Sequence, residues 1–78
     1  MFNRKKQAEE ARIADIRSKI NFHYTVMDGL ILHRMDVVQE VITGTIPEMV
    51  EYNRQRYYEL NAEIDRHMKA VEELEKEI

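Results

Sequence analysis

Residues 41–50 read VITGTIPEMV, and they include the only proline of the chain and one of its two glycines. The stretch begins like a helix end, because Gly44 can take the left-handed conformation that closes a C-terminus. It continues like a new helix, since Thr45 can cap it and Glu48 can complete a capping box. Pro47 falls in the first turn, where its missing N–H costs nothing. These features predict a turn between two helices.

The segment after the turn contains a line of mostly apolar residues at spacings of three and four over its whole length, which we call its seam. Such a heptad pattern predicts one helix with a single interacting seam. Only Asn53 and His67 interrupt the seam with polar side chains. The seam residues are Ile46, Val50, Asn53, Tyr57, Leu60, Ile64, His67, Val71, Leu74 and Ile78.

The segment before the turn is apolar over a broader face. One seam consists of Ile13, Ile16, Ile20, His23, Met27, Leu30, Arg34, Val37 and Val41. A neighbouring stripe adds Tyr24, Ile31, Met35, Val38 and Ile42. Two stripes side by side predict that this helix buries more than one face. Gly29 lies inside the segment at a cost of about 1 kcal/mol against alanine, so we expect either a close helix approach or a kink there.

Folding the chain at residues 44–45 pairs positions whose numbers sum to about 90 in an antiparallel register. Leu30 then lies opposite Leu60, His23 opposite His67, and Arg34 near Tyr57. The predicted fold is therefore all-α, a two-helix antiparallel hairpin of the coiled-coil type.

The predicted boundaries follow from the same patterns. Helix 1 is expected over about residues 8–43, the turn at 44–45 and helix 2 over about residues 46–77. The hairpin as a whole is expected to occupy residues 13–78. Residues 1–12 are expected to form a basic N-terminal arm or an extension of helix 1.

A lone hairpin cannot cover both stripes of helix 1. We therefore expect a homodimer that forms a four-helix bundle, or docking onto a different protein. Two extended helices that swap across the turn remain an open alternative. The expected self-association core is Ile16, Ile20, Met27, Leu30, Ile31, Met35, Val38, Ile42, Val50, Tyr57, Leu60, Ile64, Val71 and Leu74.

Composition limits the classes of protein to consider. A chain of 78 residues forms one domain at most, and without cysteine it has neither disulfides nor a cysteine-based metal site. The N-terminus is polar where a signal peptide is apolar, and no run is long enough to span a membrane. We expect a soluble, cytoplasmic protein with no membrane contact.

The histidines allow two interpretations. His23 and His67 are expected in one layer, and a dimer would bring four imidazoles together, as in a metal site or a pH-sensitive layer. A polar layer that fixes helix register explains the same spacing, and we favour it. No cofactor is expected.

Residues 61–65, Asn-Ala-Glu-Ile-Asp, resemble the Ser-Gln-Glu-Leu-Asp signature of the small helical-hairpin phosphatases that act on phosphorylated response regulators. Glu63 and Asp65 match that signature, whereas its serine and glutamine are replaced. The resemblance implies a phosphatase that depends on these two carboxylates. No nucleophile–base pair or phosphate-binding loop accompanies them, so we expect no enzyme.

Two groups of residues have side chains suited to contacts with nucleic acid or with a partner protein. Lys5, Arg12 and Lys19 recur every seven residues and so share a helix face. The second group combines arginine and tyrosine, which suit RNA stacking, protein hot spots or the shielding of a helix interface. Its members are Tyr52, Arg54, Arg56 and Tyr58.

The function expected from these features is protein–protein interaction without catalysis. The chain would act as an adaptor, regulator or inhibitor through self-association and through an unidentified protein partner. A dimeric hairpin that binds RNA is the alternative, and its binding would weaken steeply with salt. A phosphatase-like hairpin is the third interpretation.

Overall fold

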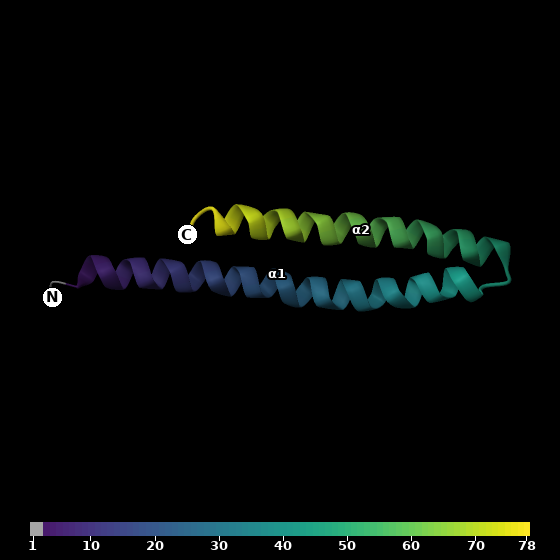
Figure 1. The fold of residues 1–78 in the computed structure, drawn as a ribbon, viewed down its shortest axis with the longest axis horizontal. Coiled ribbons are helices and arrows are strands. Elements are labelled where there is room, and N and C mark those ends of the chain that lie inside the picture. Colours follow the sequence, from purple (N-terminus) through teal and green to yellow (C-terminus); the bar gives the residue numbers. More distant parts are fainter. Residues whose placement is uncertain (1–2) are drawn as a thin grey trace.

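A computed structural model describes residues 3–78 as two antiparallel α-helices (Figure 1). Helix α1 spans Arg4–Thr43 and helix α2 spans Pro47–Glu75. The two helices pack against each other, which confirms the predicted all-α hairpin. Residues 1–2 of the predicted arm lie outside the described residues. The rest of the arm continues α1, which begins four residues before the expected position.

The connection consists of Gly44, Thr45 and Ile46. Gly44 has φ −68° and ψ 143°, so the expected left-handed conformation is wrong. The expected capping box is also wrong, because Ile46 is the N-cap of α2 and no side chain caps this end. Pro47 opens α2 as expected.

Steric space explains the glycine at position 44. A Cβ atom there would lie 2.6 Å from the carbonyl oxygen of Glu40 and 2.8 Å from Cγ2 of Val50. Both distances are shorter than ordinary van der Waals contact. The tight return of the chain therefore needs a residue without a side chain, although its dihedral angles are open to any residue.

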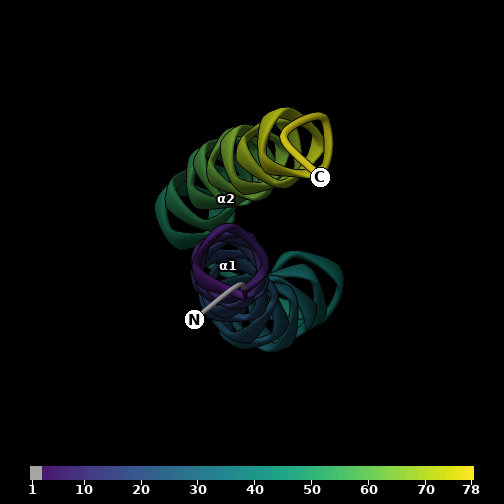
Figure 2. The same cartoon turned by 90° about the vertical axis from the view of Figure 1, so that its left-hand side faces the viewer.

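The core is one layer of side chains along the two seams. Leu60 is completely buried, and burial of a leucine contributes about 1.5–3 kcal/mol to folding. Seen end-on, the two helices lie side by side and curve along their length (Figure 2). The buried residues are Ile16, Met27, Val37, Leu60, Ile64 and Val71.

The register is also the predicted one, because Nδ1 of His23 lies 2.8 Å from Nδ1 of His67. The expected close helix approach at Gly29 is not found. A Cβ atom at this position would meet nothing within 4 Å, and the residue is exposed, so Gly29 does not face the other helix. Neither helix is long and apolar enough over the described residues to cross a membrane.

Candidate self-association face

The residues expected in the self-association core differ in exposure. Five of them are buried between the helices, namely Ile16, Met27, Leu60, Ile64 and Val71. A further group is half-buried and consists of Ile20, Leu30, Ile31, Val38, Val50, Tyr57 and Leu74. Met35 and Ile42 are 62% and 74% exposed. The hairpin therefore covers most of the expected core by itself and leaves Met35 and Ile42 open.

The exposed residues continue into an apolar surface along α1. Tyr24 and Leu32 on α1 are also exposed, and a groove next to Ile42 is lined on α2 by Tyr57, Tyr58 and Arg54. We use the name outer face for Tyr24, Ile31, Leu32, Met35, Val38, Ile42, Tyr57 and Tyr58. Sequence reasoning missed Leu32, although it lies three residues before Met35 and so on the neighbouring turn.

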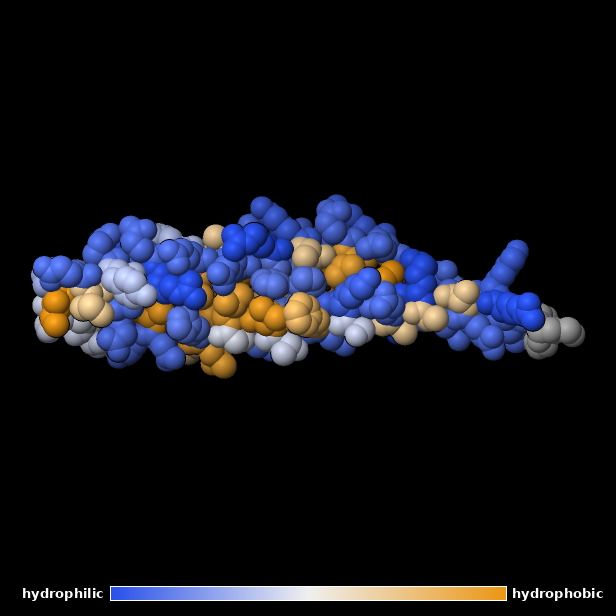
Figure 3. Space-filling model, turned by 180° about the vertical axis from the view of Figure 1, so that it is seen from behind, coloured by the Kyte–Doolittle hydropathy of each residue, from blue (hydrophilic) through white to orange (hydrophobic). Residues whose placement is uncertain are grey.

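The opposite flank of the hairpin also carries exposed apolar surface. Phe22 is 62% exposed there and lines a hollow with His23, Ala70 and Leu74. Viewed from behind, the hairpin shows hydrophobic residues in a broken band between hydrophilic ones, and the N-terminal end is mostly hydrophilic (Figure 3). On this face, apolar surface is therefore concentrated over the paired part of the helices.

The total exposed surface is large for the mass of the chain. The hairpin exposes 6245 Å², whereas a compact monomer of 9.4 kDa exposes about 5,000 Å². Its extents of 68 × 15 × 12 Å explain the difference, because two helices form a rod with only one layer of core. The excess of roughly 1,200 Å² is comparable with the surface that one partner contributes to a stable protein interface.

Two polar layers interrupt the seam. His23 and His67 form the first, with ring centroids 5.0 Å apart and both rings half-buried. Arg34 forms the second, and its Nη1 donates to Oδ1 of Asn61 over 2.8 Å. Tyr57 was the expected neighbour of Arg34, but the hydrogen-bond partner is Asn61, whose amide oxygen accepts from the charged guanidinium group.

The remaining chemical candidates are dispersed. No three histidine, aspartate or glutamate side chains within residues 3–78 come together in a group able to hold a metal ion. Glu63 and Asp65 lie on either side of the buried Ile64. Asp65 is paired with Lys69 over 3.0 Å. The two carboxylates of the phosphatase-like segment therefore point to different flanks of α2.

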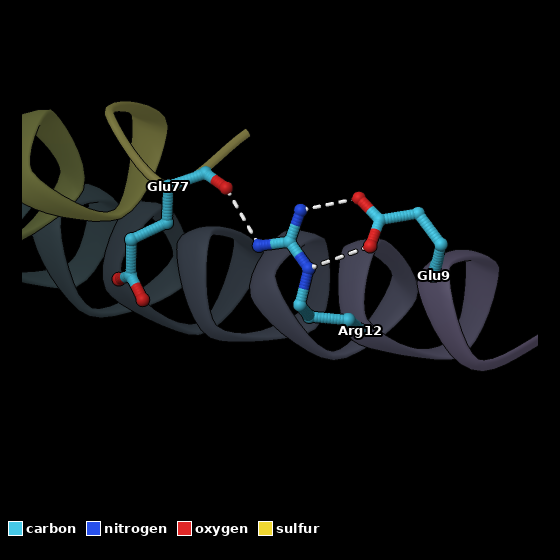
Figure 4. Close-up of polar contacts among 3 residues, drawn as sticks. All are labelled: Glu9, Arg12 and Glu77. Atoms are coloured by element: carbon cyan, nitrogen blue, oxygen red, sulfur yellow. Dashed lines mark hydrogen bonds and ion pairs between the residues drawn. The ribbon is translucent and has the colours of Figure 1, made fainter. Parts of the chain in front are cut away.

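The three cations proposed for a nucleic-acid face have different surroundings. Lys5 is exposed, and Lys19 is paired with Asp15 over 3.0 Å. Arg12 bonds the Glu9 carboxylate and donates from Nη1 to the main-chain carbonyl of Glu77 over 2.7 Å (Figure 4). The hydrogen bond to Arg12 lowers the pKa of Glu9 and raises the pKa of Arg12. Two of these three cations are thus already neutralised by carboxylates.

The arginines of the tyrosine and arginine cluster on α2 are also paired with carboxylates. Tyr52 and Tyr58 are 64% and 58% exposed. Arg54 is paired with Glu51 and Arg56 with Glu59, each over 3.1 Å. The aromatic rings are available for contacts, whereas both guanidinium groups already have a carboxylate partner.

Comparisons with known protein families, with curated proteins and with solved structures found no match to this chain. The functional argument therefore depends on the surface of the hairpin alone.

Proposed function

We propose that this protein is a non-enzymatic protein–protein interaction module that dimerises through its outer face into a four-helix bundle. The observation that carries the proposal is the apolar stripe of α1 that α2 leaves uncovered. Leu32, Met35 and Ile42 are each more than 60% exposed, although they lie within three turns of one helix. Covering such a stripe with a second apolar helix face is the arrangement found in bundles.

A second copy of the chain is the occupant that the surface supports best. The excess surface of roughly 1,200 Å² exceeds the ~800 Å² that each partner buries in an interface of standard size. A two-fold axis would place the same apolar stripe on both sides of the contact, so that each copy covers the other. Tyr57 and Tyr58 would extend the contact onto α2, beside the groove at Ile42.

The dimer would leave a charged exterior for a further protein partner. Ion pairs such as Asp15–Lys19, Asp65–Lys69 and Glu73–Lys76 link neighbouring turns along both helices. Exposed pairs of this kind contribute little to stability. Their charged groups stay in contact with water. A further partner would therefore bind at the ends and flanks of the bundle.

The test is the absolute mass in solution, measured by light scattering on a sizing column over a wide range of concentrations. We expect the wild type at twice 9.4 kDa and the Met35→Glu variant at 9.4 kDa. Phe22→Glu is the matched control, because Phe22 is also 62% exposed but lies on the opposite flank. It should remain a dimer.

Two results would contradict the proposal. A wild type that stays at 9.4 kDa at every concentration would mean that the outer face does not bind a second copy. Equal dissociation of the Met35→Glu and Phe22→Glu variants would mean that the contact does not depend on this face. Circular dichroism of both variants checks that each remains helical.

A further inference from the structure

The contact between His23 of α1 and His67 of α2 depends on how many protons the two rings carry. A hydrogen bond between two Nδ1 atoms 2.8 Å apart needs one nitrogen with a hydrogen and one without. The pair therefore bonds when both rings are neutral, in opposite tautomers, or when only one ring is charged. It cannot bond when both rings are charged, since both Nδ1 atoms then carry a hydrogen.

Acid converts this contact from attraction to repulsion. Histidine is the side-chain type that ordinarily changes charge between pH 8 and 5, so acid is the condition that can charge both rings. Two positive rings with centroids 5.0 Å apart then repel each other in a half-buried layer, where water screens them incompletely. Relief of this repulsion requires that the two rings, and the helix segments that carry them, move apart at this level.

Nearby charges do not cancel this repulsion. Lys19 of α1 and Glu73 of α2 line the hollow beside His23, and they are paired with Asp15 and Lys76. Glu63 lies one turn before His67 on α2 and is half-buried. One carboxylate can offset one imidazolium, but a second positive charge in the layer is left without compensation.

The position of the layer decides which part of the hairpin would respond. Between the layer and the turn, the seam holds Met27, Val37, Leu60 and Ile64 in buried positions and the bond between Arg34 and Asn61. On the other side, the buried residues are Ile16 and Val71, with the exposed bond from Arg12 to Glu77 at the end. The open end is thus held by fewer buried contacts.

We propose that the His23–His67 pair is a pH-operated latch, which holds the open end of the hairpin closed at neutral pH and releases it when both rings are charged. The turn end stays paired. Because the latch lies within one hairpin, the inference goes beyond the proposed dimerisation and does not depend on it. Opening takes up protons, so the open end loses stability as the pH falls.

The test compares amide hydrogen exchange at pH 7.5 and pH 5.0, expressed as protection factors that correct for the intrinsic rate. We expect the protection of residues 68–75 to fall by up to about tenfold per pH unit once the second proton binds. The protection of residues 52–62 should stay nearly constant. EDTA in every sample removes adventitious metal, and repeating the measurement on Met35→Glu separates the latch from self-association.

Two variants assign the effect to the pair. His33→Gln removes the third, exposed histidine and should respond to pH as the wild type does. His23→Leu/His67→Leu makes the layer apolar and should keep residues 68–75 protected at pH 5.0. His67→Asn retains a polar layer with one titratable ring and should also lose the response. Unchanged protection in the wild type, or an equal loss in the double leucine variant, would overturn the proposal.

Discussion

Gly44 is the residue at which an added methyl group would interfere with the turn. Its amide donates to the carbonyl of Glu40 over 2.8 Å, and a Cβ atom would press on that carbonyl and on Val50. Gly29 is the natural comparison, since a Cβ atom there meets nothing within 4 Å. A side chain would therefore clash with its neighbours at Gly44, whereas there is room for one at Gly29.

Gly44→Ala should lower the free energy of unfolding by about 1–3 kcal/mol, because the added methyl overpacks the turn. Gly29→Ala should raise it by about 1 kcal/mol, because alanine is the better helix former. Urea unfolding at one fixed protein concentration measures both, which keeps any contribution from association constant. A Gly44→Ala variant as stable as the wild type would show that the turn can relax around the methyl group.

Single residues also mark where sequence reasoning reached its limit. Spacing alone placed His23 opposite His67, because helical periodicity fixes which side chains face the neighbouring helix. It did not find Asn61 as the partner of Arg34, since a long side chain can reach more than one turn. Nor did it find the steric reason for Gly44, because that depends on the path of the backbone after the turn.

The two helices differ in how clearly their ends could be predicted. Pro47 marks the start of α2 in both the sequence and the structure. The start of α1 was placed too late, because residues 3–12 contain no large apolar side chain to extend the periodic pattern. Lysine, glutamine, alanine and glutamate there still favour a helix by intrinsic propensity, so α1 begins at Arg4.

The seam that joins α1 and α2 has its most enclosed point at Leu60. Leu60→Ala should lower the free energy of unfolding by about 2–5 kcal/mol through lost burial and a cavity. Met49→Ala is a control on the same helix, since Met49 is 52% exposed and should change stability by only about 0.5 kcal/mol. Thermal unfolding followed by circular dichroism measures both variants.

Leu60→Asp tests the same seam more severely. A carboxylate at a fully buried position leaves a charge without a partner, so the helical signal or the assembly should be lost. If this variant stayed fully helical and associated as the wild type does, then the antiparallel register would not be the one that stabilises the protein in solution.

For the molecule as a whole, the second stripe of α1 was predictable from sequence, but the amount of surface it leaves open was not. Periodicity identifies an apolar face without stating how much of it a neighbouring helix covers. The structure supplies that quantity, because α2 buries the seam and leaves Met35 and Ile42 exposed. The area argument for a second copy uses the total exposed surface of 6245 Å², which periodicity does not give either.

Overall length distinguishes a dimer of hairpins from two extended chains that exchange helices across the turn. A single hairpin is 68 Å long, and two hairpins paired about the outer face should reach at most about 90 Å at a rise of 1.5 Å per residue. A continuous helix through the turn would approach about 115 Å. Small-angle X-ray scattering on a sample of known mass measures the largest dimension directly.

We expect a dimer in the shorter range, because Pro47 lacks the N–H that a continuous helix needs and because Gly44 fits the tight return. A dimer longer than about 110 Å would mean instead that the chain is straight at residues 44–46, and that each seam is filled by the other copy.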